Sequence, residues 1–332
     1  MIFPLMNGIM SFAKAPVTWA IFFLNLVVFL MTMQTSDDLQ VKVEDYTRDS
    51  LFSRTQGVIF ADFIESNPDR YPASMRLLAS EAKNSLDTER RELLGNMALR
   101  DSFFLKEALT IQSGPDDVAL KWWKKKFSEL AEYRMLHPSY SFGVTRSEPG
   151  LMRMISYQFS HSGFSHFMGN MIFFLIFACS LEGIIGGLGL LVCYLLSGIF
   201  AALSFSLLNE ASAIPLIGAS GAVSGIMALF SVLMWGRGVR YVFFLLIPKR
   251  GYAGLIYLPA WVTLILWFLS DLAGHLATPS ELGGIAYSAH LGGEASGIAI
   301  GLMILVMRKI KGQPVLPKEL PIDTQPVMTR YV

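Results

Sequence analysis

Long apolar runs with almost no charged residues constrain the fold of this chain more than any other feature. Each is close to the roughly 20 residues that a helix needs to cross the core of a bilayer. The six runs cover approximately residues 17–33, 166–185, 186–208, 218–235, 255–272 and 286–307. The sequence therefore predicts an all-α polytopic membrane protein, a bundle of six transmembrane helices.

The charged residues gather in one part of the chain. Only 16% of residues are charged and 53% are hydrophobic, against about 25% and 45–50% in a typical soluble domain. Most acidic residues lie between Asp37 and Glu148. This distribution predicts a large polar outer loop between the first and second helices.

Two helices are expected in this loop, over residues 74–94 and 116–134. The second places four apolar residues at helical spacing among lysines: Leu120, Trp123, Phe127 and Leu130. Such a helix could lie in the membrane interface. The alternative is a surface helix of a small soluble subdomain, and the sequence leaves both open.

The short connections predict the orientation in the membrane. Basic residues stand between the fourth and fifth runs and after the sixth: Arg237, Arg240, Lys249, Arg250, Arg308, Lys309 and Lys311. The opposite connections carry Glu210, Asp271 and Glu281 and no Lys or Arg. By the positive-inside rule, both termini are expected in the cytoplasm. The first run lacks a following cleavage site, which favours an uncleaved helix. We expect a multi-pass protein of the cell (inner) membrane.

Four segments follow from these features. Residues 1–34 hold the N-terminus and first helix, 35–141 the partly helical extracytoplasmic insert, 142–308 the core with helices two to six, and 309–332 a proline-rich cytoplasmic tail, expected to be disordered. Cys179 and Cys193 lie in apolar runs and are expected to be buried hydrophobic side chains. We expect no metal, no cofactor and no nucleic-acid partner.

A serine flanked by glycines heads the fourth run, in the sequence Gly218-Ala219-Ser220-Gly221. Serines in membrane helices commonly bond back to their own helix, so Ser220 alone is weak evidence for catalysis. Ala222 excludes the esterase elbow G-x-S-x-G. However, the predicted topology brings Ser220 to the same depth as His290, His166 and Asn170, at the outer ends of three helices. This coincidence predicts a serine nucleophile with a histidine base.

Glycines at four-residue spacing explain how two of these helices could meet. Gly221 and Gly225 share one face of the fourth run, and Gly293 and Gly297 share one face of the sixth. Such faces let helices approach closely in lipid, as a Ser–His hydrogen bond of about 2.6–3.2 Å requires. Plain helix packing is the alternative. It leaves His290 unexplained, and an intramembrane histidine is a functional hypothesis by default.

His166 and Asn170 are four residues apart, on one face of the second run. With the backbone N–H of Ser220 they could form an oxyanion hole, or they could merely tie helix ends together. Neither an Asp nor another Glu is spaced persuasively to orient His290. Glu294 could share its helix face, and a Ser–His dyad is the simpler interpretation. His137 and His275 belong to no recognisable pattern.

Over residues 142–307 the chain resembles the rhomboid intramembrane serine proteases. The matching motifs are His161-x-x-x-x-His166-x-x-x-Asn170, Gly218-Ala219-Ser220-Gly221 and Ala289-His290-x-x-Gly293-x-x-x-Gly297. The resemblance implies that Ser220 is the nucleophile, that His290 is its base, and that His166, Asn170 and the Ser220 N–H form the oxyanion site. Supporting positions around these groups are implied for His161, Gly218, Gly221 and Gly293.

The resemblance also implies a structural role for the carboxylate of Glu182. The chain departs from the family in two ways: its outer loop is longer than in minimal members, and Ser224 replaces an aromatic residue that stacks on the histidine in some members.

The expected function is an intramembrane serine endopeptidase that cleaves transmembrane segments of membrane proteins near the outer membrane face. Its partners would be transmembrane protein substrates and the lipid bilayer. Two alternatives remain open. One is a catalytically silent rhomboid-like factor that binds membrane proteins. The other is a six-span transporter with His166 and Asn170 on a polar path, although the chain shows no internal repeat of the kind common in transporters.

Overall fold

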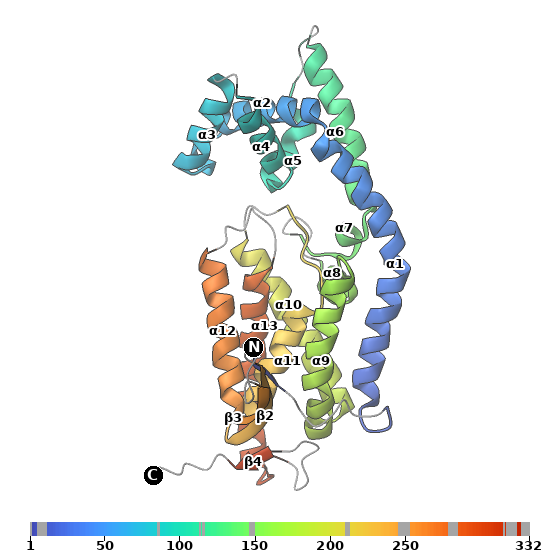
Figure 1. Cartoon of the computed structure of the whole chain (residues 1–332), viewed down its shortest axis with the longest axis vertical. Helices are drawn as coiled ribbons and strands as arrows, with labels where there is room; N and C mark the ends of the chain where they lie inside the picture. Colours follow the sequence, from blue (N-terminus) through green and yellow to red (C-terminus); the bar gives the residue numbers. More distant parts are fainter. Residues whose placement is uncertain are drawn as a thin grey trace.

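The computed structural model divides along its long axis into a helical head, a bundle of apolar helices and a small β-sheet (Figure 1). It describes residues 2–4, 12–84, 87–112, 114, 117–145, 150–209, 213–244, 253–277, 285–314, 316 and 324–326. The predicted helical membrane architecture is confirmed in these residues. The predicted count of six spanning helices is not established by these residues, and the all-α prediction needs correction because four strands are present.

Five helices in the described residues are long and apolar enough to cross a membrane. They are α1 (Pro16–Arg48), α9 (Phe164–Ile185), α10 (Gly187–Leu208), α12 (Ala260–Ala277) and α13 (Tyr287–Ile310). Three of them, α9, α10 and α13, match the predicted runs to within a few residues. Helix α1 continues beyond the predicted end of its run at residue 33 and enters the head (Figure 1).

The fourth predicted run forms the shorter helix α11 (Ser220–Leu233), which lies at the centre of the bundle. Its 14 residues rise only about 21 Å, which is less than the roughly 30 Å of a bilayer core. Every residue from Gly221 to Leu233 is buried by protein. Neighbouring helices therefore surround α11 and replace lipid as its apolar solvent.

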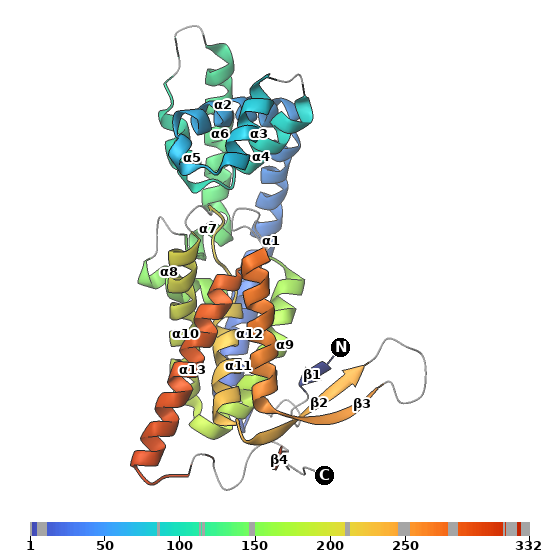
Figure 2. The same ribbon diagram turned by 90° about the vertical axis from the view of Figure 1, so that its left-hand side faces the viewer.

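A four-stranded antiparallel sheet lies at the end of the bundle opposite the head and projects sideways from it (Figure 2). Its strands are β1 (Ile2–Pro4), β2 (Arg237–Phe244), β3 (Ala253–Pro259) and β4 (Thr324–Pro326). Strand β2 pairs with all three others, and Gly238 stands opposite Pro259 in the β2–β3 register.

Strand β3 occupies the start of the predicted fifth helix, so the prediction of helix from residue 255 was wrong. Helix α12 begins directly after Pro259, at Ala260. The strands are rich in aromatic and branched apolar residues, which favour extended backbone. Hydropathy alone does not separate such a strand from the helix that follows it.

The head contains α2 (Ser50–Ser66), α3 (Ala73–Asn84), α4 (Thr88–Ala98), α5 (Ser102–Glu107) and α6 (Val118–Leu136), with 3₁₀ turns at Pro68–Arg70 and Ala108–Thr110. Four of these helices begin at an aspartate whose side chain accepts hydrogen bonds from the first turn. These N-cap residues are Asp49, Asp87, Asp101 and Asp117. The predicted helix over 74–94 is thus two helices, because Asp87 starts a new one.

The head has its own hydrophobic core, built around Phe52, Phe60 and Phe104. The apolar face of α6 belongs to this core: Leu120, Trp123, Phe127 and Leu130 are all buried in it. Of the two alternatives for this helix, the structure therefore supports the subdomain helix and not the interfacial one. Two short helices, α7 (Pro138–Phe142) and α8 (Leu151–Ser156), and the 3₁₀ turn Tyr157–Phe159 lead from the head into α9.

Glu182 of α9 fixes the first turn of α1 to the bundle. Its carboxylate accepts the backbone N–H groups of Val17 and Thr18, at 2.9 and 2.7 Å, and the Thr18 hydroxyl at 2.7 Å. A carboxylate at a helix N-terminus satisfies otherwise unpaired donors and interacts favourably with the helix dipole. Glu182 thus has the structural role that the family resemblance implied.

Replacing Glu182 by alanine is expected to destabilise the bundle by about 2–5 kcal/mol, because it leaves two buried N–H groups and a hydroxyl unpaired. The measurement is the thermal unfolding midpoint in detergent. Glu44→Ala is the matched control, because Glu44 lies on α1 itself and forms only an exposed i,i+4 pair with Arg48. This change should alter stability by no more than about 0.5 kcal/mol. Equal midpoints for the two variants would contradict the capping role.

Candidate functional site

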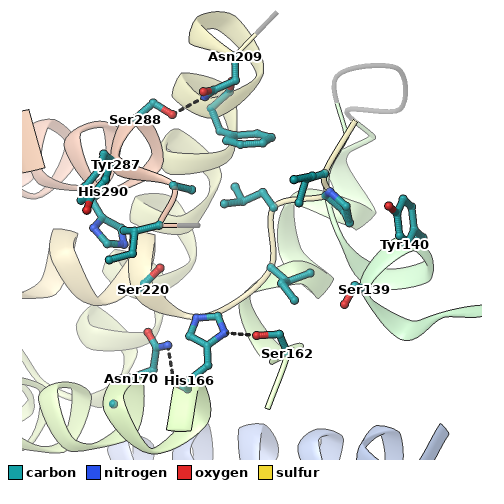
Figure 3. A pocket seen from close by; sticks show the side chains of 18 of the residues that line it. Ser139, Tyr140, Ser162, His166, Asn170, Asn209, Ser220, Tyr287, Ser288 and His290 are labelled. Carbon is teal, nitrogen blue, oxygen red and sulfur yellow. Dashed lines mark hydrogen bonds between the residues drawn. The ribbon is translucent and has the colours of Figure 1, made fainter. Parts of the chain in front are cut away.

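A cavity of about 980 Å³ lies between the head and the bundle. Its lining includes Ser220 of α11, His290 of α13 and both His166 and Asn170 of α9. Figure 3 shows these four side chains around one space. The structure therefore brings together the residues that the sequence placed at a common depth. Head residues, among them Asn96, line the same cavity from the other side.

The chain turns sharply before α11, and this turn places Ser220 as the first residue of the helix. Gly218 has φ +106°, a conformation that favours glycine. A Cβ at Gly218 would also stand 2.6 Å from Cε1 and 2.7 Å from Nε2 of His166. Glycine is thus required both by the backbone conformation and by the packing of the His166 ring.

Two hydrogen bonds hold the turn from outside. The N–H of Gly218 donates to the Tyr157 carbonyl at 2.9 Å, and the N–H of Ala219 donates to Nε2 of His161 at 3.4 Å. Burial lowers the pKa of His161 to about 3, so the ring is neutral and its Nε2 lone pair is free to accept this bond. His161 also packs edge-on against His166, with ring centroids 5.3 Å apart.

Helices α11 and α13 touch backbone to backbone through their glycines. A Cβ at Gly293 would stand 2.0 Å from the carbonyl oxygen of Gly221, and one at Gly297 would stand 2.1 Å from that of Gly225. The predicted close approach of the two glycine faces is confirmed. This contact fixes the N-terminal turn of α11 against the part of α13 that carries His290.

His290 has a carboxylate partner that sequence reasoning missed. Its Nδ1 lies 3.1 Å from Oδ1 of Asp271, and both residues are buried. We expected Asp271 in an outer connection and no persuasively placed acid for His290. The predicted run ended at residue 272, so Asp271 stood at its very end and was counted with the outer connection, whereas α12 continues to Ala277 and carries Asp271 well inside the helix. A lone aspartate in an apolar helix is a signal that could have identified this residue.

The aromatic contact to His290 comes from its own helix. The Tyr287 ring stands edge-on to the imidazole, with centroids 6.4 Å apart. Ser224, where some family members have an aromatic residue, is buried and lines the cavity. Tyr287 in turn packs on Gly274 of α12, where a Cβ would stand 2.4 Å from the tyrosine ring. Helix α12 thus supplies one neighbour of the imidazole, Asp271, and packs against the other, Tyr287.

His166 and Asn170 face the cavity while each keeps a local hydrogen bond. Nδ1 of His166 lies 3.1 Å from Oγ of Ser162, and Nδ2 of Asn170 donates to the His166 carbonyl at 2.8 Å (Figure 3). The Asn170 amide has a second N–H besides the one used within its helix. The oxyanion role of the two side chains remains a prediction.

Two histidines without a sequence pattern also border the cavity. His275 lies in the last turn of α12, and His137 caps the N-terminus of α7, accepting the Ser139 N–H at 3.1 Å. Burial lowers the pKa of His137, which keeps this capping nitrogen unprotonated. The cysteines Cys179 and Cys193 are free and buried, away from the cavity lining.

The fold and this cavity define a polytopic helical membrane protein with a polar site at the head end of its bundle. Residues 148–307 match the family model of the Rhomboid domain. The chain therefore carries a rhomboid domain, and these residues belong to the rhomboid family. No curated protein matches the chain.

Proposed function

We propose that this protein is an intramembrane serine endopeptidase. One observation carries the proposal: Ser220 and His290 line one cavity from two helices in backbone contact, and His290 is paired with Asp271. A serine, a histidine and a carboxylate paired with that histidine form a constellation that performs acyl transfer on unrelated folds. The rhomboid domain supports the same activity, although the family also includes inactive members.

In the proposed reaction, Ser220 Oγ attacks the scissile peptide carbonyl while His290 Nε2 accepts the hydroxyl proton. Asp271 holds the Nδ1–H of the same ring, which leaves Nε2 free to act as base. His290 then gives the proton to the leaving amine, and an acyl group remains on Ser220. Water, deprotonated by His290, hydrolyses this ester and restores the serine.

The developing oxyanion would be stabilised by the N–H of Ser220, at the N-terminus of α11, together with His166 and Asn170. These donors surround the same space from α9 and α11. Loss of one such donor typically lowers the rate by about 10²–10³. The proposed substrate is a transmembrane segment of another protein, which must unwind locally because its carbonyls are bonded within the helix.

The site lies at the head end of the bundle, near one membrane face, and Arg308 and Lys309 lie at the other end. With the basic connections on the cytoplasmic side, cleavage would occur near the outer face and both termini would be cytoplasmic. The lipid bilayer then delivers the substrate helix to the site.

A serine-reactive fluorophosphonate probe tests the proposal directly. We expect the detergent-purified protein to be labelled at one residue, and Ser220→Ala to lose the label. Ser224→Ala is the matched control, because Ser224 lies one turn further on α11 and lines the same cavity; it should still be labelled. Equal labelling of Ser220→Ala and the parent protein would refute the assignment of the nucleophile.

A further inference from the structure

A second buried carboxyl group lies behind the His290–Asp271 pair. Glu294 follows His290 by one helical turn on α13, and only 1% of its surface is exposed; for Asp271 the value is 5%. The Glu294 side chain interacts with that of Asp271, and neither of its oxygens is hydrogen-bonded to the imidazole. Two carboxyl groups and one imidazole thus form a chain across the α12–α13 contact.

The hydrogen-bond partners of this chain are incomplete if both carboxyls are ionised. Oδ1 of Asp271 is satisfied by Nδ1 of His290. Oδ2 of Asp271 and both oxygens of Glu294 have no donor among the described residues. Neither carboxyl forms an ion pair with a lysine or arginine in the described part of the chain. The doubly ionised state of two neighbouring buried carboxyl groups without such partners is strongly disfavoured, because the two negative charges repel each other in a medium of low dielectric constant.

A single proton removes most of this deficit and leaves only one oxygen of Glu294 without a donor among the described residues. Placed on Glu294, it makes that residue a donor to Oδ2 of Asp271, while Oδ1 continues to accept from His290. Both oxygens of Asp271 are then satisfied, and the carboxylate is held from two sides. Burial of a polar group is tolerated when it is hydrogen-bonded in this way.

We infer that Glu294 is protonated at neutral pH and, by donating to Asp271, makes the Asp271–Glu294 pair the positioning element for His290. This inference rests on the proposed protease function for its consequence in catalysis. The pair carries one negative charge at rest, so the cluster becomes neutral when His290 accepts the Ser220 proton. The other titratable groups beside the imidazole are Tyr287, whose ring stands edge-on to it, and His166, which lines the same cavity.

Kinetics of three variants on a transmembrane substrate test the positioning role. Asp271→Asn is expected to lower kcat by at least about 100-fold with little change in KM, because the asparagine amide favours the wrong imidazole tautomer. Glu294→Gln is expected to lose much less activity than Glu294→Ala, because the glutamine N–H replaces the donor to Oδ2. Equal losses in Glu294→Gln and Glu294→Ala would show that the charge of Glu294 matters and not its proton, and would overturn the inference.

An infrared measurement tests the protonation without depending on activity. The protein at pH 7 should show the carbonyl stretch of a neutral carboxylic acid, both in the parent form and in Ser220→Ala. Glu294→Gln should remove this band. Asp62→Asn is the control, because Asp62 is exposed and paired with Lys83 in the head, and it should leave the band in place.

The two measurements separate the possible failures. A band that is absent from the parent protein overturns the shared proton even if the protein cleaves substrates. Cleavage that survives in Ser220→Ala refutes the proposed function, while the band still decides the protonation of Glu294. Unfolding midpoints of all variants in detergent identify any loss of activity that is caused by unfolding.

Discussion

Ser220→Ala and His290→Ala are each expected to lower kcat for cleavage of a transmembrane substrate by on the order of 10⁵-fold. Without the hydroxyl there is no acyl acceptor, and without the imidazole nothing removes its proton at neutral pH. The measurement is cleavage of a reporter with a single transmembrane helix, in liposomes that contain the purified protein. Binding of the reporter should change little, because neither side chain supplies much ground-state contact area.

The double variant provides a sharper test of the same prediction. Residues that act as one catalytic unit have non-additive effects, so Ser220→Ala combined with His290→Ala should be no slower than either single variant. Ser224→Ala should remain within a few-fold of the parent protein. Additive losses, or a Ser220→Ala protein that still cleaves at a tenth of the parent rate, would exclude the proposed nucleophile–base pair.

Gly293→Val is expected to have the largest effect on stability. A Cβ at this position would lie 2.0 Å from the Gly221 carbonyl oxygen, which is a backbone atom and cannot rotate away. Helices α11 and α13 must therefore separate. Overpacking of this kind costs about 1–3 kcal/mol or more, and here it also draws His290 away from Ser220. We expect a lower unfolding midpoint in detergent together with loss of cleavage.

Gly169→Ala is the control for this variant. Gly169 of α9 lines the cavity that contains Ser220, and a Cβ at this position would meet no atom within 4 Å. Alanine also favours helix over glycine by up to about 1 kcal/mol, so stability should be equal or slightly higher. If Gly293→Val and Gly169→Ala had the same unfolding midpoint, the backbone contact between α11 and α13 would not be essential to the stability of the bundle.

Hydropathy predicted the residue ranges of most membrane helices at the periphery of the bundle. It could not distinguish α11, because a helix surrounded by protein and a helix surrounded by lipid have the same apolar composition. It also could not separate β3 from α12, since the apolar run continues through Pro259. The position of that proline, one residue before the helix, was the available signal.

The candidate site was predictable to the extent that it depends on spacing within one helix. The glycine faces and the pair His166 and Asn170 are such features. Asp271 was missed because its role depends on contact between two helices, and because the predicted run ended five residues early, which put Asp271 at its edge. Glu294 was considered for its spacing from His290, but the side chain it interacts with is that of Asp271 on α12.

Helix α1 runs without a break for 33 residues, which corresponds to about 50 Å. Its first turn is held by Glu182, and near its other end the Tyr46 hydroxyl donates to Glu129 of the head at 2.9 Å. A second link joins the Ala213 N–H to the Arg100 carbonyl of the head at 3.0 Å. The head residues that line the cavity opposite Ser220 are therefore joined to the bundle by a continuous helix and not by a flexible hinge. The separation of head and bundle, and with it the width of the entrance to the cavity, then depends on the stiffness of α1.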